Sequence, residues 1–156
     1  MWQQLEYQEQ NRLFGQMNRY LDSTPDGPHW LKQPAVAQAV AGSLHHRREQ
    51  VYDLDTFCIM SNHVHLVFTP LPKEDNSYHS LSSIMHSLKL YTARCANTIL
   101  QRSGGFWQKE SYDHVVRDEA ELGRIRSYVL ANPVRAGLVS AWNEWEWSFS
   151  RYLQDE

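Results

Sequence analysis

The sequence predicts an α+β domain with a mostly antiparallel sheet. Three observations favour this class: two apolar segments of strand length joined by a short turn, helical periodicity on both sides of that pair, and a length of 156 residues, which suits one domain. The expected order is helix, helix, strand, strand, helix, short strand, helix. We expect a single domain over residues 1–156, with an N-terminal helix in 1–27 and the main body in 28–156.

Two helices are expected ahead of the strand pair. Apolar residues recur at helical spacing over residues 2–21, and the Pro- and Gly-containing segment 22–28 ends that pattern. Residues 34–49 form the second expected helix, with a proline at its start, where proline is tolerated. No strand is predicted before the pair, so the expected sheet lacks a first strand.

The strand pair is the clearest element of the sequence. VYDLDTFCIM (51–60) and HVHLVFTP (63–70) are separated by Ser61-Asn62, and asparagine suits such a turn because it tolerates positive φ. Side chains alternate between the faces of a strand. His63 and His65 therefore share one face of the second strand, and its opposite face is apolar.

Two imidazoles on one strand face can bind one metal ion. Their backbone positions lie about 7 Å apart, from the rise of a strand, so both rings can converge on a divalent cation. The alternative is one hydrogen-bonded core histidine and one solvent-facing histidine, and chance readily produces the motif in a chain with 8 histidines. A metal site also needs at least one further protein ligand.

The second half of the chain adds a long helix, a short strand and another helix. We expect a helix over about 79–101, a glycine-led loop over 104–118 with a short strand near its end at 114–116, and a helix over about 119–131 that ends before a proline. Asp118 and Glu121 resemble a capping box at the start of that helix. The aromatic segment 142–152 is expected to be a strand or a packed coil.

Tyr128 and Asn132 stand one turn apart on the last expected helix, at the edge of its apolar stripe. A phenol oxygen can act as a nucleophile, and an amide oxygen can bind a hard divalent ion. The alternative is a tyrosine that packs and an asparagine that ends the helix. Spacing alone leaves both interpretations open.

Composition favours a cytoplasmic protein and gives little indication of DNA binding. The formal net charge of −3 is not typical of a nucleic-acid-binding domain, although a local basic patch can serve. Two cysteines form no disulfide framework, no apolar run approaches the roughly 20 residues of a membrane span, and the start does not resemble a signal peptide.

Several segments together resemble one known family. SNHVHLVF resembles the histidine strand of the single-tyrosine HUH transposases, and SYVLANPVRAGLV resembles the tyrosine segment of their REP-associated branch. IMHSLKLYTARCAN, GGFWQKESYDHVVRDEAEL and WEWSFSRY resemble other parts of these transposases in the same order. The similarity covers about residues 28–152.

This resemblance implies a fold and a chemistry. The fold would be a ferredoxin-like antiparallel sheet with helices on one face, including a first strand that is not found in this chain. The activity would be cleavage and rejoining of single-stranded DNA through a 5′-phosphotyrosine, with Tyr128 as nucleophile. His63, His65 and Asn132 would bind the metal, Mg2+ or Mn2+.

The resemblance also implies partners and contacts. The partner would be single-stranded DNA with hairpins or palindromic repeats, and the protein would be nucleoid-associated, as a monomer or homodimer. Candidate phosphate contacts are Lys89, Arg94, Lys109, Arg117, Arg124, Arg126 and Arg135. Each of these could instead be a solvated surface charge. His114 is a candidate base, and Phe106 or Trp107 could stack on bases or belong to the core.

Two other functions stay open. A domesticated or truncated chain could keep the fold and bind DNA without strand transfer, which the missing strand and acidic balance would favour. An unrelated metal-dependent hydrolase could use the histidine pair without Tyr128.

Overall fold

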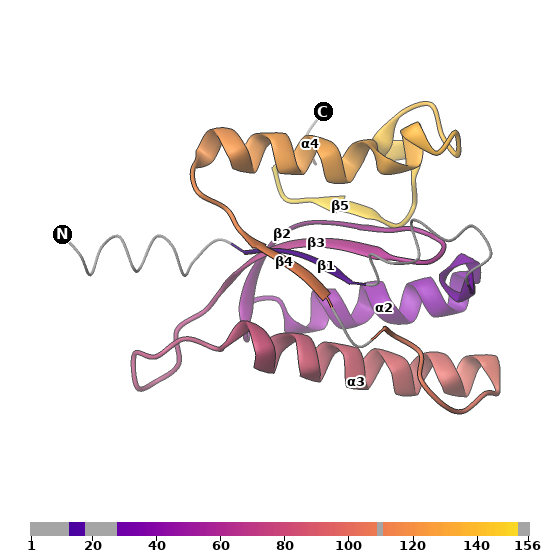
Figure 1. The fold of residues 1–156 in the computed structure, drawn as a ribbon, viewed down its shortest axis with the longest axis horizontal. Helices are drawn as coiled ribbons and strands as arrows, with labels where there is room; N and C mark the ends of the chain where they lie inside the picture. Colours follow the sequence, from indigo (N-terminus) through magenta and orange to yellow (C-terminus); the bar gives the residue numbers. More distant parts are fainter. Residues whose placement is uncertain (1–12, 18–27, 109–110, 153–156) are drawn as a thin grey trace.

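The computed structural model describes residues 13–17, 28–108 and 111–152. Its strands are β1 (Leu13–Met17), β2 (Tyr52–Ile59), β3 (Val64–Pro70), β4 (Ser111–Val115) and β5 (Ser148–Ser150). Its helices are α2 (Pro34–Arg47), α3 (Leu81–Leu100) and α4 (Glu119–Arg135), with short 3-10 turns at Trp30–Lys32 and Trp142–Glu144 (Figure 1).

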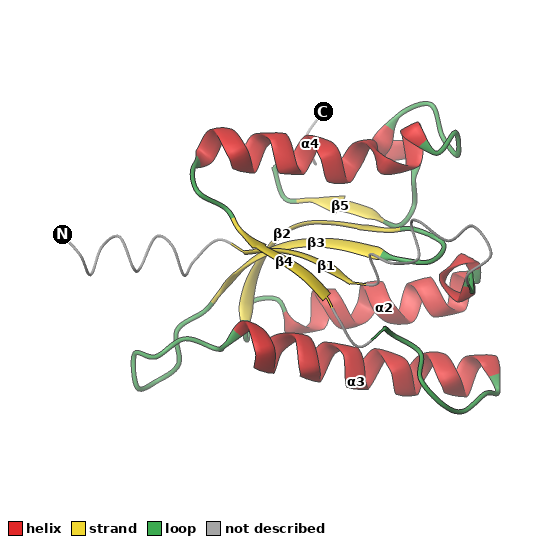
Figure 2. Cartoon of the chain, viewed as in Figure 1, coloured by secondary structure: helices red, strands yellow, loops and turns green. Residues whose placement is uncertain are grey.

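The strands form one antiparallel sheet in the order β4-β1-β3-β2-β5 (Figure 2). Without β5, the chain follows the β-α-β-β-α-β path of a ferredoxin-like fold. The predicted fold class is therefore confirmed, and β5 extends the sheet beyond β2.

The expectation that the first strand is missing is wrong. Residues 13–17, which were expected to be helical, form β1 in the interior of the sheet, where Gly15 pairs with Leu66 of β3 and Asp113 of β4. Pairing with two neighbouring strands outweighs a local helical pattern, because tertiary context overrides propensity. The rest of the expected helix over 2–21 lies outside the described residues.

The helices cover both faces of the sheet. Figure 1 shows α2 and α3 on one side and α4 on the other. The larger apolar core lies between the sheet and α2 and α3, and it includes Leu66, Leu44 and Leu88. A smaller core joins Val67 of β3 to Val129 of α4. The expectation of helices on one face thus holds for α2 and α3 but is wrong for α4, whose apolar stripe packs on the opposite face.

The β2–β3 hairpin is confirmed, with one irregularity. Its turn is closed by a hydrogen bond from the Met60 amide to the His63 carbonyl, 2.9 Å long. The register with β3 shifts between Leu54 and Thr56, so that Asp55 is an extra residue in β2. Such a bulge redirects side chains. It allows Leu54 and Phe57, three residues apart, to enter the same core.

The start of α4 follows the prediction, but its end does not. The Asp118 side chain caps the helix by accepting from the Glu121 amide at 2.8 Å. The helix continues through Pro133 to Arg135 instead of ending before the proline. Proline has no amide proton to donate to the Val129 carbonyl, and the side-chain amide of Asn132 donates to that carbonyl instead, at 3.3 Å. No helix in the described ranges is long and apolar enough to cross a bilayer.

Candidate functional site

The two histidines meet on the α4 face of the sheet. Their side chains are buried, with His63 4% and His65 0% exposed. Their Nε2 atoms lie 3.1 Å apart, and their rings are nearly perpendicular at 87°. The strand therefore presents two ring nitrogens to the same point, as the alternation predicted.

Asn62 determines which nitrogen of His63 carries the proton. Its side-chain oxygen lies 2.7 Å from Nδ1 of His63. An amide oxygen only accepts, so Nδ1 donates to it, and the lone pair of a neutral His63 ring is then on Nε2, which faces His65. A hydrogen bond on the far nitrogen is the usual way in which a metal-binding histidine is oriented.

Tyr128 is on α4, the helix that packs on this face of the sheet, and it lies against the histidine pair. Its ring centroid is 5.5 Å from that of His65, at an interplanar angle of 83°. The side chain is 46% exposed. Tyr128 thus contacts a buried histidine on one side and is accessible to a ligand from solvent.

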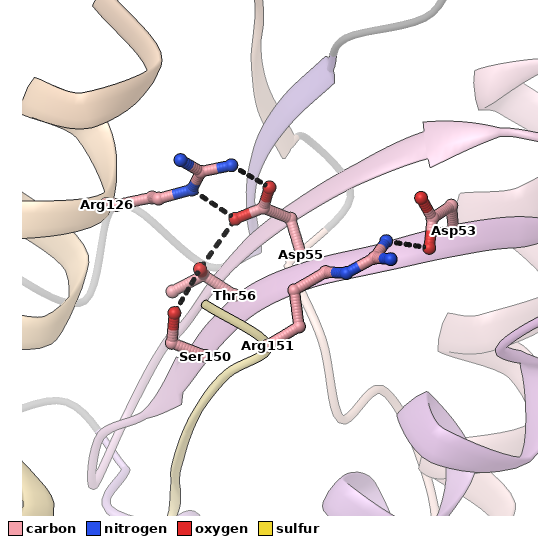
Figure 3. A network of polar contacts seen from close by, with 6 residues as sticks. All are labelled: Asp53, Asp55, Thr56, Arg126, Ser150 and Arg151. Atoms are coloured by element: carbon pink, nitrogen blue, oxygen red, sulfur yellow. Dashed lines mark hydrogen bonds and ion pairs between the residues drawn. The ribbon is translucent and has the colours of Figure 1, made fainter. Parts of the chain in front are cut away.

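An ion pair fixes α4 on the sheet close to Tyr128. Arg126 donates two hydrogen bonds to the carboxylate of Asp55, at 2.8 and 2.6 Å. Figure 3 shows this pair beside Thr56, which donates to Asp55 at 2.7 Å. The hydrogen bond to Asp55 also raises the pKa of Arg126. Arg126 was a candidate phosphate contact, but here its charge is paired with a carboxylate.

Asn132 and Arg135 surround the backbone of Tyr128. The Asn132 amide donates to the Tyr128 carbonyl at 3.3 Å, and its side-chain oxygen accepts from Arg135 at 3.0 Å. Arg135 also donates to the Tyr128 carbonyl at 3.2 Å, and its guanidinium lies 4.4 Å from the centre of the Tyr128 ring. Asn132 therefore lies one turn from Tyr128, as predicted, with its oxygen held by an arginine.

The remaining candidate phosphate contacts fall on different sides of the sheet. Lys89 and Arg94 belong to α3, across the sheet from the histidines. Lys89 donates to the Gln108 carbonyl at 3.3 Å, and desolvation lowers its pKa. Arg117 and Arg124 are exposed at the start of α4 and along it. Lys109 lies outside the described residues.

Phe106, Trp107 and His114 have structural partners. Phe106 is buried and stacks on Trp30, with centroids 5.3 Å apart. The Trp107 indole donates to the buried Thr92 hydroxyl at 2.8 Å. His114 pairs with Glu121, and this hydrogen bond lowers the pKa of Glu121. For the two aromatic residues, the core alternative matches what the structure shows.

Sequence reasoning missed three contributors to this site. Asn62 could have been suspected, because it precedes the histidine pair directly. Arg135 was considered only as a phosphate contact, although its spacing from Tyr128 corresponds to two helical turns. Asp55 had no local signal, because its partner lies 71 residues away in the chain.

The part of the chain that carries this site matches a known protein family. The family model "Transposase IS200 like" matches residues 34–132, well over half of the chain, and includes both histidines, Tyr128 and Asn132. The chain belongs to the IS200-like transposase family. The matched segment includes β3, the turn before it and most of α4, where the residues singled out from the sequence lie.

Individual relatives point to one branch of the IS200-like transposases. A Haemophilus influenzae protein named as a REP-associated tyrosine transposase is 27% identical over 67% of this chain and 63% of its own length. The REP-associated tyrosine transposase of Escherichia coli K12 is 22% identical over 65% of this chain and 56% of its own length. The chain thus spans less than two thirds of these relatives.

A solved structure has the same fold as this IS200-like chain. It is described as a REP-associated tyrosine transposase bound to a REP hairpin, and it matches with a TM-score of 0.64 over 90% of this chain and 76% of its own. The sequence identity is 18%, so this likeness concerns the fold.

Proposed function

We propose that this protein cleaves and rejoins single-stranded DNA, with Tyr128 as the nucleophile. One observation carries the proposal: the converging Nε2 atoms of His63 and His65, 3.1 Å apart, lie against the ring of an accessible tyrosine. Membership of the IS200-like transposase family supports it, since the matched segment contains all of these residues.

The residues fit a divalent metal. His63 presents a lone pair because Asn62 holds its proton on the other nitrogen. No three His, Cys, Asp or Glu side chains gather at one point in the described part of the chain, so a third protein ligand would be of another type. We propose the side-chain oxygen of Asn132, which would exchange its hydrogen bond from Arg135 for the ion. Two imidazoles and an amide oxygen suit Mn2+ better than Mg2+.

The chemistry follows from the negative charge of a phosphodiester, which repels nucleophiles. A bound divalent ion would polarise the scissile phosphate and stabilise the charge of the transition state. The Tyr128 oxygen would form a bond to phosphorus while the bond to the 3′ oxygen breaks. The products are a 5′-phosphotyrosine and a 3′-hydroxyl, after the phenol releases its proton and the leaving oxygen gains one. The reverse reaction rejoins the strand without ATP, because the covalent link keeps the bond energy.

The substrate class is proposed as a single strand that carries a hairpin. The structural neighbour is described as bound to a REP hairpin, and both named relatives are REP-associated transposases. Arg117 and Arg124, which are exposed just before α4 and along it, are the predicted phosphate contacts proposed for this strand.

The test is a denaturation-resistant adduct between protein and DNA. Hairpin oligonucleotides with single-stranded flanks are labelled at the 3′ end, because that fragment stays on the tyrosine, and incubated with Mn2+. We expect a labelled protein band that disappears with EDTA, with His63→Ala and with Tyr128→Phe.

Tyr152→Phe is the matched control. Tyr152 is also an exposed tyrosine under an arginine, with the Arg126 guanidinium 4.0 Å from its ring centre, and its loss should leave the adduct intact. An adduct that persists in Tyr128→Phe would refute the nucleophile. Hairpin binding without any adduct would instead indicate a DNA-binding protein without strand transfer.

A further inference from the structure

A cavity of about 380 Å³ lies beside the candidate site and has no assigned role. Part of its wall is Met60 and Ser61, the residues directly before Asn62 and His63. Another part is Leu138, three residues after the end of α4, the helix that carries Tyr128. The cavity therefore lies between the turn that precedes the histidines and the segment that follows α4.

Two tryptophans form the aromatic part of the cavity wall. Trp145 and Trp147 both line it, and both are packed against apolar cores of the protein. The Trp145 indole donates to the Ile59 carbonyl at 3.0 Å, and the Trp147 carbonyl accepts from the Ile59 amide at the same distance. Tryptophan side chains in such a wall are suitable platforms for stacking a base.

The opening of the cavity is polar and carries positive charge. Lys32 is exposed at its edge. His29 lies beside it and shares a hydrogen bond of 3.0 Å with the Ser61 hydroxyl. An apolar pocket with a cation at its edge suits a base whose adjacent phosphate stays in solvent, since single-strand sites combine aromatic platforms with basic groups.

We propose that this cavity receives one unpaired nucleobase of the DNA strand whose phosphate is cleaved at Tyr128. The inference rests on the proposed function. From Tyr128 to the end of α4 is about 10 Å along the helix axis, a distance that a few linked nucleotides span. A volume near 380 Å³ holds one base with its sugar and falls within the range of small-ligand pockets.

The test compares binding of DNA strands that each lack one base. The probe is the tightest hairpin selected from a pool with a randomised single-stranded flank, labelled with fluorescein. It is then remade with a single abasic site at each flank position. Affinities are measured by anisotropy on the Tyr128→Phe protein, so that cleavage does not intervene. We expect one abasic position to weaken binding about tenfold or more, the usual effect of losing one stacked base.

Variants at the cavity edge test whether the base missing at the sensitive abasic position is the one that enters the cavity. Leu138 is 51% exposed, so Leu138→Asp should fold while placing a charge in the cavity. It should weaken binding of the intact probe and abolish the penalty of the sensitive abasic position. Leu90→Asp is the matched control, because Leu90 is 44% exposed on α3, across the sheet, and the penalty should remain. Lys32→Ala should weaken the binding of all probes equally and reduce the salt dependence of that binding.

The results separate this inference from the proposed function. Equal affinity for every abasic probe, in a protein that still forms the Tyr128 adduct, would refute the base pocket alone. An abasic penalty unchanged by Leu138→Asp would place the sensitive base elsewhere and refute it as well. A protein that neither binds the probes nor forms the adduct would refute both.

Discussion

Removing the carboxylate of Asp55 should weaken both the fold and the reaction, because that carboxylate holds α4 in place. The Asp55 and Arg126 side chains are only 13% and 19% exposed, and two hydrogen bonds join them. Exposed ion pairs contribute about 0.2–1 kcal/mol, whereas breaking a buried pair costs about 3–5 kcal/mol. For this intermediate case, we expect Asp55→Asn to lower the free energy of unfolding by about 2 kcal/mol.

Urea unfolding measures this effect, and a second aspartate provides the control. Asp53 pairs with Arg151 on the same edge of the sheet (Figure 3), but these side chains are 46% and 34% exposed. Asp53→Asn should therefore cost less than about 1 kcal/mol. A double-mutant cycle of Asp55→Asn with Arg126→Gln should give a coupling of about 1–2 kcal/mol. Equal unfolding midpoints for the two aspartate variants would refute the argument.

The same variant should also slow adduct formation under conditions where it is fully folded. Arg126 precedes Tyr128 by two residues, so a looser α4 changes the position of the phenol relative to His65. A displacement of about 1 Å can cost about 100-fold in rate. We expect a loss of about 10- to 100-fold in Asp55→Asn and little change in Asp53→Asn, measured as adduct formed in a single turnover.

Other contacts give further expectations. Arg135→Lys keeps the charge but loses the planar group over Tyr128, so adduct formation should slow about tenfold; an unchanged rate would show that the stacking is irrelevant. Thr92→Val leaves the indole N–H of Trp107 without its acceptor and should lower the free energy of unfolding by about 1–3 kcal/mol, measured in urea. Burial raises the pKa of Cys58 to about 11, so its thiol stays protonated in the folded protein. Between pH 9 and that value only the unfolded chain loses this proton, so stability should fall with rising pH there, and rapid labelling of native Cys58 at pH 8 would contradict this.

The hairpin and its histidines could be predicted because their signals are local. Strict alternation placed His63 and His65 on one face, and both lie there in the structure. The spacing of Tyr128 and Asn132 likewise predicted that the two residues lie one turn apart on the same helix, as they do in α4. Periodicity could not predict the distance between His65 and Tyr128, since that distance depends on how α4 packs on the sheet.

Three features escaped, because each depends on pairing or hydrogen bonds that periodicity does not reveal. β1 is a strand through pairing with β3 and β4, and its own five residues do not indicate this. The bulge at Asp55 changes the face of every later residue in β2, which strict alternation cannot anticipate. The extension of α4 through Pro133 depends on a side-chain hydrogen bond from Asn132, where sequence rules predict a helix end.

The position of β1 also bears on how the protein forms during synthesis. β1 leaves the ribosome first, yet its partners β3 and β4 follow about fifty and about a hundred residues later. Closing such long loops costs entropy before any pairing is gained. The strand that borders the histidines can therefore pair fully only after β4 has been made, and the Tyr128 helix can dock only after β3 is in place. A nascent chain should thus gain its proposed DNA-processing site only after α4 has been made.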